Sequence, residues 1–201
     1  MSKDKIYELT LDDITRDGVT AISIVEFPAI KENFQIFSNN KKTNYTFAKV
    51  DSEKRIITGP AMIPNKNIFR IDYLTFEEYF IYFSEQTVQK ISEQYFIQNN
   101  ISNVTLEHQS NVNDISVIES WIVNDPNNDK SKSLGYDVNK GTWMISMKIN
   151  NDEIWENVVK AGKVNGFSIE GYFTEKIDNF SSQELSDDEI LEQIKKLLDL
   201  I

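Results

Sequence analysis

Gly-Phe-Ser-Ile-Glu-Gly-Tyr-Phe, residues 166–173, alternates between apolar and polar side chains over most of its length, and this period of two predicts a β-strand. Because successive strand residues point to opposite faces, Phe167 and Ile169 share one face, and Ser168 and Glu170 share the other. Most serines in such a pattern simply form the polar side of a strand. A serine hydroxyl becomes a nucleophile only where a neighbouring base accepts its proton. The role of Ser168 therefore depends on which bases the rest of the chain supplies.

Short strand-like segments recur along most of the chain, separated by turn residues such as Gly59-Pro60. We expect a strand over 19–25 that stops before Pro28, and further strands over 45–50, 55–58, 61–63, 67–71, 79–83, 103–108, 114–123 and 142–149. Ser84 suits the N-cap of a helix over 84–97, and Gly162 suits the end of a short helix over 152–161. The pattern predicts an α+β fold, mostly β, with a closed or partly closed sheet and about three helices.

Polar composition at two places divides the chain into three parts. The segment 38–44 is polar, so we expect an N-terminal arm over 1–44 and a main domain over 45–177. A second polar stretch precedes the tail, 178–201, where Ser186 and Glu189 form a capping box. Apolar residues follow on one helical face, namely Ile190, Ile194, Leu197, Leu198 and Ile201. The tail therefore predicts a C-terminal amphipathic helix that docks on the body or joins copies of this chain in a homo-oligomer.

Composition argues against several classes of function. The chain of 201 residues contains no cysteine, which rules out disulfides, thiol nucleophiles and thiolate metal sites. A formal net charge of −11 repels phosphates and argues against nucleic-acid binding. No apolar run reaches the roughly 20 residues of a membrane span, and the N-terminus lacks the apolar core of a secretory signal. We therefore expect a soluble cytoplasmic protein with no membrane, nucleic-acid, metal or cofactor partner.

His108 is the single histidine, and this count restricts the chemistry more than any other. It follows Val104 and Leu106 at a spacing of two, so it is predicted at the end of an apolar strand face. A hydrogen-bonded histidine at a strand end is the commoner explanation of such a position. The alternative is a general base at the edge of a site, because imidazole titrates near neutral pH. No other imidazole could activate Ser168.

Glu119 stands out because it interrupts an apolar stripe. Ile115 and Val117 are predicted on its strand face, and a carboxylate among such residues is costly to bury unless it is paired. One role for it would be to orient and charge-stabilise an imidazole, as the acid of a catalytic triad does. Otherwise Glu119 reaches water or pairs with a lysine or arginine. Glu170, on the face of Ser168, is the second candidate for the acid.

Several stretches resemble the XkdF-like phage serine proteases, a branch of the prohead (capsid maturation) proteases. The similar segments are AISIVEFPAI (21–30), KRIITGPAMIPNKNIFR (54–70), NVTLEHQ (103–109), VIESWIVNDPNNDKSKSLG (117–135), GTWMISMKI (141–149) and GKVNGFSIEGYF (162–173). They extend over most of the chain up to residue 173, and the tail lies outside them. The resemblance implies that the family's histidine falls on His108 and its serine on Ser168.

The same resemblance implies a herpesvirus-assemblin-like fold, in which a few helices flank a β-barrel-like body. It also implies a serine endopeptidase that cleaves phage scaffold and major capsid protein inside the assembling prohead, with its own chain as a further candidate substrate. The herpesvirus relatives use a second histidine as third catalytic residue, which this sequence lacks. A carboxylate must replace it, with Glu119 the first choice and Glu170 the second, or the enzyme works as a dyad. The competing interpretation is a non-catalytic capsid-assembly or scaffold protein with a protease-like fold.

Overall fold

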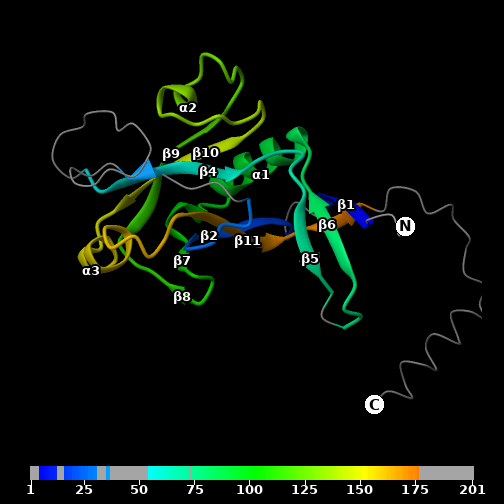
Figure 1. Cartoon of the computed structure of the whole chain (residues 1–201), viewed down its shortest axis with the longest axis horizontal. Helices are drawn as coiled ribbons and strands as arrows, with labels where there is room; N and C mark the ends of the chain where they lie inside the picture. The colour runs from blue at the N-terminus through cyan, green and yellow to red at the C-terminus, as the bar shows by residue number, and fades with distance from the viewer. Residues whose placement is uncertain (1–4, 13–15, 31–34, 37–53, 73, 177–201) are drawn as a thin grey trace, which may run out of the picture.

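The computed structural model describes residues 5–12, 16–30, 35–36, 54–72 and 74–176. These residues form three four-stranded sheets with short helices beside them (Figure 1). The mostly β character with a few helices is confirmed. Strand pairing in the described part of the chain forms no closed barrel, so the barrel-like body that the resemblance implies stays an expectation. The predicted strand over 45–50 and the tail helix lie outside the described residues.

The first sheet, called the site sheet below, has the strand order β11-β2-β7-β8. It contains β2 (Gly18–Val25), β7 (Val104–Leu106), β8 (Ser110–Asn111) and β11 (Gly166–Tyr172). β2 is antiparallel to β11 and parallel to β7, so it lies between them. The predicted strands over 19–25 and 166–173 are both confirmed, and they are neighbours although far apart in the chain.

The second sheet, the central sheet, has the order β3-β4-β10-β9. It contains β3 (Gln35–Ile36), β4 (Ile56–Met62), β9 (Ile115–Ile122) and β10 (Trp143–Ile149). The turn predicted at Gly59-Pro60 is wrong, because β4 runs through it. The ladder between β4 and β10 shifts register beside Pro60, and such an irregularity accommodates a residue without an N–H donor.

The third sheet, the hairpin sheet, has the order β12-β1-β6-β5. It contains β1 (Lys5–Thr10), β5 (Ile68–Ile71), β6 (Glu78–Tyr82) and β12 (Thr174–Lys176). β5 and β6 form a hairpin that projects from the rest of the molecule (Figure 1). β1 and β2 both belong to the predicted N-terminal arm, and both are paired with strands of the predicted main domain.

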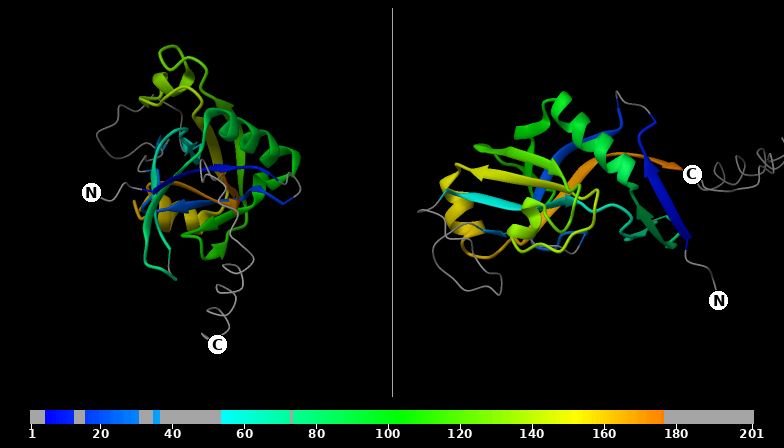
Figure 2. Two further views of the ribbon diagram at one scale, coloured as in Figure 1. Left: turned by 90° about the vertical axis from the view of Figure 1, so that its right-hand side faces the viewer. Right: turned by 90° about the horizontal axis from the view of Figure 1, so that it is seen from above.

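Helix α1 (Glu85–Ile97) begins as predicted after Ser84, whose hydroxyl accepts a hydrogen bond from the Thr87 N–H at 3.4 Å. It packs against β2 and β10 (Figure 2). The other helical segments are η1 (Asn100–Ser102), α2 (Lys130–Ser133), α3 (Asp152–Ile154) and the π-turn η2 (Trp155–Val159). The last two replace the regular helix predicted over 152–161. No helix in the described ranges is long and apolar enough to cross a membrane.

Gly171 is required where β11 crosses close to β2. A Cβ atom at this position would lie 2.1 Å from the Gly18 carbonyl oxygen. Gly171→Ala is therefore expected to lower the free energy of unfolding by about 3 kcal/mol, because the backbone itself must move. Gly162→Ala is the matched control: its Cβ would meet nothing within 4 Å, and only its left-handed backbone, φ 69°, costs about 1 kcal/mol. Denaturant titrations of the two variants measure the difference, and equal losses would contradict it.

Candidate active site

A row of hydroxyl side chains crosses the site sheet. Ser168 on β11 is paired with Ser23 on β2, and Ser23 is paired with Thr105 on β7. Directly paired residues of neighbouring strands project from the same face of a sheet. Glu170 lies two residues from Ser168 on β11, so it also projects from this face. The polar face of β11 predicted from the sequence is thus continued across two further strands.

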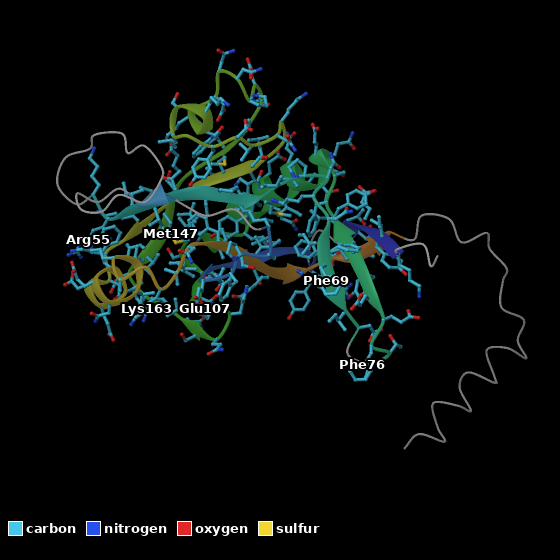
Figure 3. The ribbon with its side chains drawn as sticks, viewed as in Figure 1. Arg55, Phe69, Phe76, Glu107, Met147 and Lys163 are labelled. Carbon is cyan, nitrogen blue, oxygen red and sulfur yellow. The ribbon has the colours of Figure 1, made fainter. Side chains whose placement is uncertain are left out.

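His108 lies in the turn between β7 and β8, and not at the end of a continuous strand as predicted. β7 stops at Leu106, and the two next residues adopt left-handed conformations, with φ of 51° at Glu107 and 58° at His108. Glu107, labelled in Figure 3, marks the position of this turn between β7 and β8. Positive φ is uncommon for residues other than glycine and costs roughly 1 kcal/mol or more per residue, so other contacts must hold this turn.

Ser23 supplies one of those contacts. Its side chain is fully buried in the site sheet. Its hydroxyl oxygen accepts a hydrogen bond from the His108 backbone N–H at 2.9 Å, and the hydroxyl donates to the Thr105 carbonyl at 3.4 Å. The sequence pattern alone did not indicate a role for Ser23. The available signal was a small polar side chain between the apolar Ile22 and Ile24.

The imidazole of His108 contacts Glu170. Nδ1 of the ring lies 3.1 Å from Oε1 of the carboxylate, and the Thr105 hydroxyl donates a hydrogen bond to the same oxygen. An ionised carboxylate only accepts hydrogen bonds, so the proton of a neutral ring resides on Nδ1 and the lone pair on Nε2. Ala21, the residue opposite Glu170 on β2, is small and leaves room for the carboxylate to reach across β2.

Ser168 shares this face but its hydroxyl makes no hydrogen bond within the described residues. The side chain is half-buried. Its Cα lies roughly 7 Å from that of Glu170, the spacing of alternate strand residues. In enzymes without bound substrate the bond between nucleophile and base is often long and shortens only when substrate binds. The structure thus places Ser168, Glu170 and His108 on one face and joins the last two directly.

Glu119 lies elsewhere, on β9 of the central sheet. A register shift on β9 sets Val117 opposite Met147 and Glu119 opposite Ser146, so Val117 and Glu119 project from opposite faces. The predicted apolar stripe around Glu119 is therefore wrong, because the bulge reverses the alternation. The Glu119 carboxylate accepts hydrogen bonds from Ser146, at 2.9 Å, and from Lys130. The structure brings the second candidate, Glu170, to the imidazole and gives Glu119 other partners.

The surroundings of Glu119 explain its charge state. Partial burial alone would raise the pKa of this carboxyl, but the hydrogen bonds from Lys130 and Ser146 and the positive charge of Lys130 bring the pKa below its ordinary value. The Lys130 ammonium also lies 4.8 Å from the centre of the Trp121 ring. This is the structural ion pair considered above as the alternative to a catalytic role.

The edge of β11 next to Ser168 carries backbone groups that point away from the sheet. The N–H of Ile22 donates to the carbonyl of Asn103, just before β7, at 3.1 Å. Because backbone groups alternate in direction along a strand, the N–H and C=O of Ser23 face β11 instead. Ser168, paired with Ser23, accordingly directs its own N–H and C=O toward β2. The N–H of Ile169 then points the opposite way, toward an edge along which no described strand is paired.

Fold and site together define a mostly β protein that carries serine, histidine and glutamate on one sheet face, the side chains that a serine hydrolase uses. The family model "Putative phage serine protease XkdF" matches residues 43–178, more than half of the chain. The chain belongs to this family, as the resemblance predicted. No curated protein and no solved structure matches the chain. The assemblin-like fold therefore stays an expectation.

Proposed function

We propose that this chain is a serine endopeptidase in which Ser168 is the nucleophile, His108 its general base and Glu170 the acid that orients the imidazole. The observation that carries the proposal is the 3.1 Å contact between the only histidine and a carboxylate two residues from Ser168. Family membership supports the reaction class. Glu119 has no part in the proposed mechanism, because its carboxylate is bonded to Lys130 and Ser146.

The reaction begins when the Ser168 oxygen attacks the scissile carbonyl carbon and its proton passes to Nε2 of His108. Glu170 accepts the Nδ1 proton in a hydrogen bond and stabilises the imidazolium that forms. The imidazolium then protonates the departing amine as the carbon–nitrogen bond breaks. Water, deprotonated by the same imidazole, hydrolyses the ester on Ser168 and restores the hydroxyl.

The developing oxyanion needs donors beside Ser168. The Ile169 N–H belongs to the residue after the nucleophile and points away from β2, to the side of β11 on which no described strand is paired, which suits this role. One such donor typically contributes about 3 kcal/mol to the transition state. The edge of β11 is thus the side from which a substrate approaches.

The substrates that fit the family's context are the phage scaffold and the major capsid protein, cleaved inside the assembling prohead in the bacterial host. An endopeptidase needs an extended segment of substrate, and the N–H of Ile169 on the outer edge of β11 can hydrogen-bond such a segment. Confinement to the prohead would restrict cleavage to proteins enclosed with the enzyme.

The experiment that tests the proposal is labelling with an alkyl fluorophosphonate. The Ser168 oxygen bonds to phosphorus, fluoride leaves and His108 takes the hydroxyl proton. We expect one adduct by intact mass, located on Ser168 by peptide mapping and missing from Ser168→Ala. A wild-type protein that forms no adduct on Ser168 would contradict the proposal and favour the non-catalytic assembly protein.

Ser23 is expected to matter for rate as well as stability. Ser23→Ala removes the acceptor of the His108 N–H, so the left-handed turn loses its support. We expect the free energy of unfolding to fall by about 1 kcal/mol, and the labelling of Ser168 to slow by about tenfold because the imidazole is less well placed. Nitrogen-15 chemical shifts of the single imidazole report the tautomer directly. An unchanged labelling rate with unchanged shifts would show that Ser23 only stabilises the fold.

A further inference from the structure

A cavity of about 240 Å³ lies beside Ser168 where the three sheets meet. The hairpin sheet contributes Leu9 and Ile81, the central sheet contributes Met62, and β11 contributes Ile169. Further apolar lining comes from Ile63, Ile68, Phe83, Phe167 and Phe173. Ser168 is also among the lining residues, but its hydroxyl projects from the opposite face of β11 to the side chains of Phe167 and Ile169, so the cavity lies across the strand from the hydroxyl.

The position of the cavity relative to β11 matches a substrate lying along the strand edge. The Ile169 N–H points away from β2, and Ile169 itself lines the cavity. Phe69, labelled in Figure 3, marks β5 of the hairpin. Its neighbours Ile68 and Arg70 and the hairpin residue Ile81 line the cavity. In an extended peptide the side chain nearest the attacked carbonyl is the one on the acyl side of the scissile bond. A substrate residue whose carbonyl accepts a hydrogen bond from the Ile169 N–H pairs with Ile169 and projects its side chain from the same face, toward the cavity.

The lining determines the chemistry that the cavity accepts. A cavity of about 150 Å³ lined by leucine, isoleucine and phenylalanine is large enough to hold benzene, so this larger one holds a leucine, methionine or phenylalanine side chain. A charged side chain would lose its hydration without an ion pair from the apolar wall. Arg70 is the charged residue among the described lining, and it is exposed, with its guanidinium donating to the Phe69 carbonyl at 2.9 Å.

We propose that this cavity is the specificity subsite of the enzyme and that it selects an apolar residue on the acyl side of the cleaved bond. The inference rests on the proposed function, since it takes Ser168 as the nucleophile. Filling an apolar pocket with a well-matched side chain typically changes the specificity constant by 10- to 200-fold.

The test uses peptidyl diphenyl phosphonates that differ only in the side chain next to phosphorus: alanine, leucine, phenylalanine, lysine or glutamate. Attack by Ser168 forms the oxygen–phosphorus bond, phenoxide leaves and the hydroxyl proton passes to His108. Intact mass against time gives the rate of each probe. We expect the leucine and phenylalanine probes to react at least tenfold faster than the alanine probe, and the lysine and glutamate probes to react more slowly than leucine.

Variants of the segment after β2 locate the effect. Ala29 is exposed and lines the cavity, so Ala29→Trp fills it and is expected to lower the leucine-to-alanine rate ratio at least fivefold. Phe27 is 82 % exposed and lies outside the lining, so Phe27→Trp should keep the ratio within twofold. Labelling of Ser168 with no apolar preference, or with a preference for glutamate, overturns the subsite alone. Failure of every probe to label Ser168 overturns the proposed function as well.

Discussion

Replacing His108 by asparagine is expected to slow the reaction of Ser168 by about 10⁴- to 10⁶-fold, the range seen when a serine protease loses its base. Asparagine tolerates positive φ better than most residues, so the turn at φ 58° is preserved. The variant therefore removes the proton acceptor with little change of structure. Fluorophosphonate labelling rates, followed by intact mass, measure the effect.

Gln109 provides the matched control for this substitution. It lies in the same turn, and its side chain is exposed. Gln109→Ala is expected to keep the labelling rate within twofold of wild type. Denaturant titrations of both variants establish that the fold is retained. A His108→Asn protein that labels within threefold of wild type would show that His108 is not the base.

The second large effect is expected from Glu170. Glu170→Gln should lower the rate by about 10³- to 10⁴-fold, as loss of the orienting carboxylate does in a catalytic triad. The amide can donate to Nδ1, which favours the tautomer whose proton is on Nε2 and which cannot accept from Ser168. The same nitrogen-15 shifts of the single imidazole should report this exchange of tautomers.

Glu119→Gln is the matched comparison, because it makes the same chemical change on the central sheet. We expect its labelling rate to stay within threefold of wild type. Its carboxylate, 43 % exposed in the pair with Lys130, is a partly solvated ion, so losing it should cost less than about 1 kcal/mol. The lowered pKa of Glu119 means that this contribution is present above its unfolded-state pKa and disappears as acid protonates the folded carboxyl. A large loss of rate in Glu119→Gln, with none in Glu170→Gln, would reverse the assignment.

Much of the fold could be predicted because strands with clear alternation keep their local pattern. The strands around Ser168 and the helix capped by Ser84 are found where the sequence indicates them. The pairing of β2 with both β11 and β7 could not be predicted, because it joins residues more than 80 positions apart.

The candidate site was predictable in its chemistry and less so in its geometry. His108 was selected as the single histidine, and Ser168 as the serine at the position that the family resemblance implies. The strand face of Glu119 could not be predicted, because its interpretation assumed unbroken alternation and a bulge on β9 reverses it. Glu170 was identifiable from its strand face, but its contact depends on the left-handed turn that returns His108 over the sheet.

Co-expression with the scaffold and major capsid genes of the same phage tests the central claim most directly. Intact masses of all three proteins are compared between wild type and Ser168→Ala. We predict shortened scaffold or capsid protein with the wild-type enzyme and full-length chains with the variant. Identical masses in the two samples, whether cut or uncut, would contradict the account.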